Sequence, residues 1–326
     1  MAVKAAQTST DALWVSEWKE AVGEQTIARR SKSSSTVELF CSWFCPFAQR
    51  AWIALEEKGI DYKYVEVNPY EVDPQEPGGY TKKQLPLSVK REVYPKFIDT
   101  SPRGLVPALS DKGKSVWESL QLIEYIDEAF KGPALMPETP HQRALARIWA
   151  DHCTSRVQRA YYAMLMDQDP AGQEKAKGEF FSECREFAQA MVPESEGPFF
   201  FGKKFSLVDI AFAPFWQRFE WVGGHYRGLT FPADNPEFCR LAVWWEAVRK
   251  HPSVAATLVC RPRLIVSYSQ YSTNKGTSDY AKSMQSRLQT KAKTEANPDT
   301  GSTPVLIGSA LALGVALGFL IGYSKK

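Results

Sequence analysis

In the N-terminal part of the chain, the spacing of hydrophobic residues alternates between that of strands and that of helices. Residues 36–41, TVELFC, are mostly β-branched or aromatic, which favours a strand. In residues 46–58 apolar side chains recur at helical spacing, and Gly59 follows where a helix commonly ends. Residues 61–69, DYKYVEVNP, predict a second strand. The pattern therefore predicts a βαβ unit.

Downstream of this unit the pattern predicts a hairpin and a helix. Residues 70–96 are rich in Pro, Gly, Lys and Glu and predict a loop. Residues 104–109 and 115–119 are two strand candidates joined by a charged turn. Residues 119–130 place most of their apolar side chains on one side of a helix. The order βαβ–ββα predicts an α/β domain over residues 36–131.

The next part of the chain, residues 140–268, has the periodicity of helices. Apolar or aromatic residues recur every three or four positions from His141 onward. Ser206 precedes a long apolar stretch and Asp209 follows it by three positions, which is the spacing of a capping box. We expect this pair to serve folding, and we expect a second, all-α domain.

Polar and hydrophobic residues separate most sharply in the C-terminal part. Residues 269–303 carry many Ser, Thr, Asn, Gln and Lys residues, so we expect a polar linker. Residues 304–323 contain no charged residue, and about 20 helical residues span the roughly 30 Å of bilayer hydrocarbon. The pattern predicts a single C-terminal transmembrane helix, a tail anchor. A buried C-terminal helix is the alternative.

Residues 1–35 form an N-terminal extension ahead of the first predicted strand. They contain a candidate short helix at 14–22 and then a basic, Ser-rich run, RRSKSSS. Either this run contacts an acidic lipid or partner, or it is a solvated linker. We favour the linker.

The overall composition is that of a folded chain in a reducing compartment. The 326 residues are 44% hydrophobic, which excludes wholesale disorder. A net charge of +3 without a basic block gives no reason to expect nucleic acid as a partner. Six cysteines are too sparse for a disulfide scaffold, and the four histidines lack metal-ligand spacing. The N-terminal residues MAVKAAQTSTDALWV lack the apolar run that is typical of a secretory signal.

Cys45 is the strongest candidate for chemistry. It lies at the predicted strand-to-helix turn, and Pro46 occupies the first helical position, where proline is favoured. The N-terminus of a helix lowers the pKa of a thiol and supplies thiolate. The redox pair C-x-x-C is absent because Ala48 is the third residue after the cysteine. A single thiolate needs an external thiol to resolve a mixed disulfide, which points to small-molecule thiol chemistry. Cys41 is either a core residue, which we favour, or a disulfide partner.

These residues resemble a known family. The segments FCPFAQR at 44–50, GLVPAL at 104–109, WES at 117–119 and YIDE at 125–128 look like those of a glutathione transferase. A cysteine at the turn is similar to the omega class. The resemblance implies the glutathione transferase fold: an α/β thioredoxin-like N-terminal domain followed by an all-α C-terminal domain.

The resemblance also implies roles for individual residues. Pro107 would be a cis-proline, and the backbone of Val106 would pair with the cysteinyl part of glutathione. Glu118 and Ser119 would hold the γ-glutamyl end. For the glycyl carboxylate a lysine is expected; Lys96 is our first choice and Lys90 our second.

For the acceptor substrate, aromatic residues of the helical domain are available. Most large residues at helical spacing belong to the core. Trp244 matches a pocket position of the omega class and is our first choice, and Tyr161 and Trp216 are further candidates.

The expected function is that of a glutathione-dependent thiol transferase or reductase, acting by deglutathionylation or dehydroascorbate-type reduction. Glutathione is the expected cosubstrate, a small electrophilic or oxidised compound the second substrate, and a metal is not expected. We expect a homodimer with its catalytic domain in the cytosol, anchored in the mitochondrial outer membrane rather than the endoplasmic reticulum or peroxisome. The alternatives are a non-enzymatic membrane protein, of the chloride-intracellular-channel or organelle-shaping kind, and a glutathione-conjugating detoxification transferase.

Overall fold

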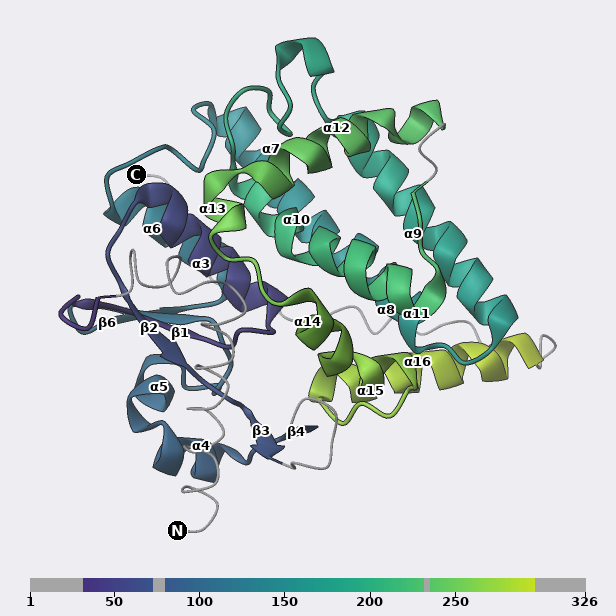
Figure 1. Ribbon diagram of the computed structural model, residues 1–326, viewed down its shortest axis with the longest axis horizontal. Helices are drawn as coiled ribbons and strands as arrows, with labels where there is room; N and C mark the ends of the chain where they lie inside the picture. The colour runs from purple at the N-terminus through teal and green to yellow at the C-terminus, as the bar shows by residue number, and fades with distance from the viewer. Residues whose placement is uncertain (1–31, 73–79, 232–234, 297–326) are drawn as a thin grey trace, which may run out of the picture. The chain divides into compact units, whose positions relative to one another are not determined.

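The computed structural model describes residues 32–72, 80–231 and 235–296 (Figure 1). Contacts divide the chain into one unit that ends at Ser286 and a second that begins at Arg287. The two domains described below and the candidate site all lie in the first unit.

The N-terminal domain is built on a four-stranded sheet. Its elements are β1 (Val37–Cys41), α3 (Pro46–Lys58), β2 (Lys63–Glu66), β5 (Ala108–Asp111), β6 (Lys114–Trp117) and α6 (Ser119–Ala129). The strand order is β2-β1-β5-β6; β1 and β2 are parallel, and the other neighbours are antiparallel. The predicted βαβ–ββα order is therefore confirmed. All five residues of β1 are buried, as expected for a central strand covered on both faces.

The segment predicted as a loop, residues 70–96, is largely regular. It contains a two-stranded hairpin, β3 (Tyr70–Val72) and β4 (Tyr80–Gln84), the helix α4 (Leu87–Val93) and the start of α5 (Pro95–Thr100). The elements are short, so no long periodic pattern reveals them in the sequence. Tertiary packing stabilises them instead, since Phe97 and Ile98 of α5 are buried.

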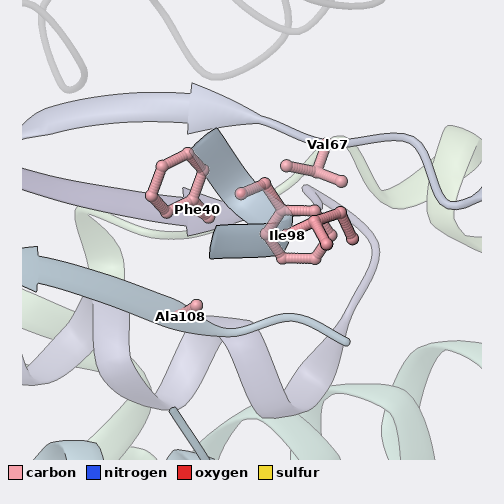
Figure 2. Close-up of a cluster of buried hydrophobic side chains, with 5 residues drawn as sticks. Phe40, Val67, Ile98 and Ala108 are labelled. Carbon is pink, nitrogen blue, oxygen red and sulfur yellow. The ribbon is translucent and has the colours of Figure 1, made fainter. Parts of the chain in front are cut away.

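One core cluster joins α5 to the sheet. Figure 2 shows Phe40 of β1 and Ala108 of β5 beside Val67, which follows β2, and Ile98 of α5. Phe97 completes the cluster, with its ring 5.7 Å from that of Phe40. In Figure 1, α3 and α6 lie on the other side of the sheet. Burial of such side chains stabilises the fold by about 1.5–3 kcal/mol each.

The C-terminal domain has helices as its regular elements in the described residues, as predicted, apart from an isolated β-bridge between Phe199 and Gly202. Its elements are α7 (Pro140–His152), η1 (Cys153–Val157), α8 (Gln158–Met166), α9 (Pro170–Ala190), η2 (Glu194–Glu196), α10 (Leu207–Arg218), η3 (Phe219–Gly223), α11 (Gly224–Arg227), α12 (Pro236–Lys250), α13 (Pro252–Ala255) and α14 (Arg261–Ser267). The predicted capping box of Ser206 and Asp209 begins α10, where the Ser206 N–H donates to the Asp209 carboxylate at 2.8 Å.

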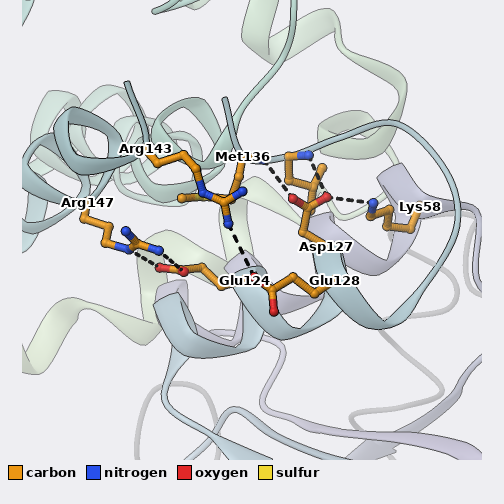
Figure 3. Close-up of polar contacts among 8 residues, drawn as sticks. Lys58, Glu124, Asp127, Glu128, Met136, Arg143 and Arg147 are labelled. Atoms are coloured by element: carbon orange, nitrogen blue, oxygen red, sulfur yellow. Dashed lines mark hydrogen bonds and ion pairs between the residues drawn. The ribbon is translucent and has the colours of Figure 1, made fainter. Parts of the chain in front are cut away.

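Ion pairs fasten α6 to the elements around it (Figure 3). Lys58, at the end of α3, lies 2.7 Å from the Asp127 carboxylate, which also accepts hydrogen bonds from the backbone N–H groups of Leu135 and Met136. Two further pairs join α6 to α7: Glu124 with Arg147, and Glu128 with Arg143. The Lys58–Asp127 pair is nearly fully buried, with 3% of the Lys58 side chain exposed.

The predicted linker over 269–303 is helical in its first part. Two helices form there, α15 (Ser269–Ser272) and α16 (Asp279–Ala296), and they bury Tyr271, Ala281 and Met284. These few apolar residues do not stand out in a polar segment. They become core residues only because the segment packs against the helical domain. Residues 297–303 lie outside the described residues.

No helix in the described part of the chain is both long and apolar enough to cross a bilayer. The predicted transmembrane segment at 304–323 lies outside the described residues. The same is true of residues 1–31, with the candidate short helix and the first three residues of the basic run, Arg29 to Ser31.

Candidate active site

A cavity of about 350 Å³ brings together residues that are far apart in the sequence. Its lining comes from the β1–α3 turn, the end of β4, the segment before β5, the start of α6 and the start of α16. Cys45, Val106, Pro107, Glu118 and Ser119 all contribute to it. The structure thus gathers at one place the five residues that local sequence motifs had singled out.

Cys45 stands at the N-terminus of α3, in an extended conformation (φ −84°, ψ 116°) with Pro46 at the first helical position. Its carbonyl accepts the first helical hydrogen bond, from the Gln49 N–H at 3.0 Å. The backbone N–H groups of the first turn therefore point toward the cysteine, and the positive end of the helix stabilises a thiolate there. The side chain is partly exposed and lines the cavity.

The other cysteines are poorer nucleophiles or lie elsewhere. None of the six forms a disulfide. Burial raises the pKa of Cys153 to about 11, and it raises the pKa values of Cys41 and Cys184 well above their ordinary value. These three remain thiols at neutral pH, and Cys45 is the one cysteine in the described lining of the cavity.

The backbone around Val106 is arranged to receive an extended ligand. The Val106–Pro107 peptide bond is cis, as the family resemblance implies. Among the described residues, neither the N–H nor the C=O of Val106 has a backbone partner. Because such groups are nearly always paired in proteins, a strand-like ligand in the cavity can complete the pairing.

Glu118 and Ser119 mark the start of α6. Glu118 has φ +72°, a conformation that costs a non-glycine residue about 1–3 kcal/mol and often marks a functional position. Its carboxylate accepts a hydrogen bond from Arg103 at 2.9 Å. Ser119 is the first residue of the helix, so its N–H and hydroxyl can receive a carboxylate.

Arg50 links Ser119 to the helical domain. Its guanidinium is buried and donates to the Ser119 hydroxyl at 3.2 Å, to the Ala211 carbonyl at 2.9 Å and to Thr154 at 3.2 Å. Burial lowers the pKa of Arg50, and the sulfur groups of Cys153 and Cys45 act in the opposite direction. Arg50 therefore positions Ser119 and places a positive charge near Cys45.

The two candidate lysines differ in position. Lys96 is exposed on α5, pairs with Glu38 and does not line the cavity. Lys90 is 3% exposed, and its ammonium donates to the Gly104 carbonyl at 3.1 Å and the Gln84 side chain at 3.2 Å. Both of these partners line the cavity. Neither lysine lines the cavity, but Lys90, the second choice, is hydrogen-bonded to two residues of the lining, whereas Lys96 is paired with Glu38.

Comparison with known proteins agrees with this architecture. The model for the glutathione S-transferase N-terminal domain matches residues 44–129, and that for the C-terminal domain matches residues 170–247. Glutathione S-transferase L3 of Arabidopsis thaliana is 32% identical over 222 residues, which cover 68% of this chain and 82% of that protein. The chain belongs to the glutathione S-transferase family.

Solved structures agree with the family assignment. The chain is similar to glutathione transferase Omega 3C of Trametes versicolor, with 31% identity and a TM-score of 0.59 over 73% of this chain and 95% of that one. A rice glutathione transferase solved in complex with glutathione shares the fold, with 24% identity and a TM-score of 0.56 over 71% of this chain and 95% of that one. As a family member, the transferase uses glutathione as its cosubstrate.

The aromatic residues predicted for the acceptor pocket of the transferase are buried in its core. Trp244 is fully buried and donates to Asp209 at 2.8 Å, and Tyr161 donates to the Arg218 carbonyl at 3.1 Å. The Trp216 ring stacks on Phe231. None of the three lines the cavities around Cys45. Helical spacing identifies such residues as inward-facing but does not say whether they face a core or a pocket.

A second cavity, of about 130 Å³, adjoins Cys45 and is rich in tyrosines. Tyr162, Tyr268, Tyr271 and Tyr280 line it, and the hydroxyls of Tyr162 and Tyr268 lie 3.2 Å apart. Burial raises the pKa of Tyr162 well above its ordinary value and that of Tyr271 to about 12. These two phenols are neutral hydrogen-bonding groups near the thiol. Tyr70 also lines this cavity. Tyr268, Tyr271 and Tyr280 come from the region predicted as linker or its border, so the sequence analysis missed these three.

Arg218 is a further residue that sequence reasoning missed. It is fully buried at the end of α10 and donates to the Phe44 carbonyl at 2.9 Å, the Gln49 side chain at 3.0 Å and the Tyr268 hydroxyl at 3.0 Å. The arginine therefore holds the residue that precedes the cysteine. Its one sequence signal is its position at the end of a predominantly apolar helix.

The described lining of the cavity contains no metal-binding cluster. His152, Glu183 and Glu186 are the one group of possible ligands found in the described part of the chain, and they lie on α7 and α9. In this structure the His152 ring nitrogen contacts the Glu183 carbonyl at 3.1 Å.

Proposed function

We propose that this transferase is a glutathione-dependent thiol transferase whose nucleophile is Cys45. The observation that carries the proposal is the position of this cysteine. It lies at a helix N-terminus and in the same cavity as Val106, Glu118 and Ser119. A thiolate is a strong nucleophile toward disulfide sulfur, whereas it is a poor group for activating the thiol of glutathione itself.

The reaction proceeds by two thiol–disulfide exchanges. The Cys45 thiolate attacks the glutathionyl sulfur of a substrate that carries glutathione in a mixed disulfide. A new disulfide bond joins Cys45 to glutathione, and the bond between glutathione and the substrate sulfur breaks. The substrate leaves as a thiolate that takes up a proton. A second glutathione, as its thiolate, then attacks the glutathionyl sulfur on Cys45. Oxidised glutathione leaves and the Cys45 thiolate is restored. The absence of a second cysteine from the described lining supports this monothiol route.

The surrounding groups have complementary roles in this proposal. The Val106 backbone pairs with the cysteinyl part of glutathione, so that the glutathionyl sulfur faces Cys45. The Glu118 carboxylate receives the ammonium of the γ-glutamyl group, and Ser119 receives its carboxylate. The tyrosine-lined cavity beside Cys45 accommodates the acceptor.

Replacement of the cysteine tests the proposal. In Cys45→Ser, release of thiol from a glutathionylated peptide should fall by at least about 100-fold, because a serine hydroxyl is not ionised at neutral pH. Mass spectrometry should find a glutathione adduct on the wild type and none at position 45 of the variant. Cys239→Ser, which removes an exposed cysteine, is the matched control and should retain full activity. Full activity in Cys45→Ser would contradict the nucleophile assignment.

We also propose that residues 304–323 hold the enzyme on a membrane with its catalytic domains in the cytosol. The uncharged length of this segment supports the proposal, since it matches the thickness of a bilayer. Its moderate, Gly- and Ala-diluted hydrophobicity and the lysines that follow suit the mitochondrial outer membrane. A homodimer is proposed on the basis of family membership alone.

A further inference from the structure

The tyrosine-lined cavity beside Cys45 contains a buried side-chain amide whose hydrogen-bonding groups are unused. Gln158, the first residue of α8, lines this cavity and is 2% exposed. Among the described residues its side-chain amide has no hydrogen-bond partner. Nor is this amide sealed inside the protein, as the unpartnered amide of Gln217 is, so a molecule in the cavity can reach it. Because buried polar groups are nearly always paired, Gln158 requires a partner from within the cavity.

The tyrosines of the same cavity, in contrast, already pair with protein groups. The hydroxyls of Tyr162 and Tyr268 lie 3.2 Å apart, and Tyr268 also accepts a hydrogen bond from Arg218 at 3.0 Å. The hydroxyls of Tyr271 and Ser278 lie 2.9 Å apart. These groups shape the cavity but are largely engaged with one another.

The size, shape and charge of the cavity restrict the partner of Gln158. The cavity measures about 130 Å³, and an apolar protein cavity of roughly 150 Å³ binds benzene, so there is room for about one ring. The stacked rings of Phe44 and Tyr70, with centroids 5.5 Å apart, give it an aromatic wall. No Asp, Glu, Lys, Arg or His belongs to the described lining, so a charged group that entered would lose water without gaining a counter-charge. A planar, uncharged ring with a hydrogen-bonding substituent fits these conditions.

The cavity is continuous with the site of the proposed reaction. Phe44, Cys45 and Phe47 line both this cavity and the larger one that contains Val106. With glutathione along Val106, the other half of a mixed disulfide enters the tyrosine-lined cavity next to Cys45. Its ring substituent then comes within reach of Gln158.

We propose that Gln158 is a specificity-determining residue that selects acceptors with an uncharged hydrogen-bonding group, such as a carboxamide, on a single planar ring. The inference rests on the proposed function, because it assumes that glutathione occupies the larger cavity and that Cys45 attacks its sulfur. The Gln158 amide can donate to the carbonyl of such a substituent and accept from its N–H. Hydrogen bonds of this kind support a preference of about fivefold over the same ring without the group.

The test uses three mixed disulfides of glutathione with benzyl thiols that differ in the para substituent, which is a carboxamide, a methyl group or a carboxylate. A methylene group separates the sulfur from the ring, so the three thiols are similar leaving groups. Cys45 takes the glutathionyl group, the benzyl thiolate leaves and is protonated, and a second glutathione releases oxidised glutathione, which is measured with glutathione reductase and NADPH. On the full-length chain kcat/KM should be about fivefold higher for the carboxamide than for the methyl compound, and lowest for the carboxylate.

Two variants complete the test. Gln158→Met keeps the length of the side chain and removes the amide, so the carboxamide-to-methyl ratio should fall to about one. Both kcat/KM values come from one enzyme preparation, so the ratio does not depend on the folded fraction. Gln189→Met makes the same change at an exposed position of α9 outside both cavities and should keep the wild-type ratio.

The outcomes separate the inference from the proposed function. A ratio near one in the wild type, an unchanged ratio in Gln158→Met, or fastest turnover of the carboxylate overturns the inference. Absence of Cys45-dependent turnover with these three compounds and with a glutathionylated peptide alike would instead overturn the proposed function.

Discussion

At the scale of the residue, the same side-chain type has different consequences in different surroundings. Three buried cysteines have pKa values raised by desolvation, whereas Cys45 lies partly exposed at a helix N-terminus. Lysines differ in the same way. Lys90 is enclosed beside the cavity, while Lys96 is exposed and paired with Glu38. The position of each of these residues in the fold, and not its amino-acid type, decides whether it is a candidate for chemistry or a residue that stabilises the fold.

The pair of Lys96 and Glu38 gives a prediction about pH. Burial acts to raise the pKa of the Glu38 carboxyl, but hydrogen bonds from Lys96 and Lys63 outweigh it and hold that pKa below its ordinary value of 4.5. A lowered folded-state pKa stabilises the protein above the ordinary pKa, and this stabilisation is lost as the pH falls through the lowered value. Lys96→Met should therefore lower the free energy of unfolding at pH 7 by at most about 1 kcal/mol, since Lys96 is largely exposed.

Denaturant unfolding at several pH values checks this prediction. The difference between Lys96→Met and the wild type should shrink as the pH falls from the ordinary carboxyl pKa of 4.5 through the lowered pKa of Glu38, because the carboxyl is then protonated in both proteins. Lys131→Met, which removes a positive charge from another exposed position, should not reproduce the pH dependence. A difference that stays constant down to pH 3 would rule out the Glu38 interaction as its source.

At the scale of the element, α3 connects the site to both domains. Its first turn carries Cys45, and its side chains Arg50 and Gln49 reach α10 and the segment after α13. The ring centroids of Phe47 and Phe215 lie 5.2 Å apart. Arg218 of the helical domain adds a further contact, because it donates a hydrogen bond to the Phe44 carbonyl just before the cysteine. The turn that carries the thiol is therefore held by tertiary contacts as well as by its own helix.

Removal of Arg218 should consequently destabilise the protein. Arg218→Met leaves the Phe44 carbonyl, the Gln49 side chain and the Tyr268 hydroxyl without their buried donor. The expected cost is roughly 3–5 kcal/mol, or a fall in Tm of about 6 °C or more. Arg156→Met, at an exposed position, should change Tm by less than about 1 °C. Equal shifts in the two variants would show that the buried network contributes little.

At the scale of the whole molecule, the candidate active site and the proposed membrane segment occupy different units of the chain. Every residue of the two cavities around Cys45 precedes Arg287, where the second unit begins. Binding and chemistry should therefore not require the residues after α16, and localisation should not require the catalytic domains.

Deletion of residues 297–326 tests this separation. The full-length chain should sediment with membranes and resist carbonate extraction, and the truncated chain should remain in the supernatant. The kcat/KM for glutathione should change by less than about twofold, because the lining of the site is intact. Deletion of residues 1–31 is the control and should leave sedimentation unchanged. A full-length chain found in the supernatant would contradict the membrane proposal.

The sequence by itself was enough to predict the βαβ–ββα order, the helical second domain and five lining residues of the cavity. Each of these rests on neighbours in the chain: the turn at Cys45, the Val106–Pro107 pair and the Glu118–Ser119 pair are local motifs whose backbone geometry depends on consecutive residues. A local motif can be recognised wherever it occurs, so these predictions needed no knowledge of the packing.

Only the tertiary structure decided which lysine approaches the site, which aromatics are core and what closes the cavity. Trp244 and Tyr162 both lie on amphipathic helices, yet one bonds to buried Asp209 and the other lines the tyrosine-rich cavity. Asp279 enters the site from a segment whose composition suggested a linker. The physical reason is that exposure and charge environment depend on which distant elements pack together, and hydrophobic periodicity carries no information about the partner.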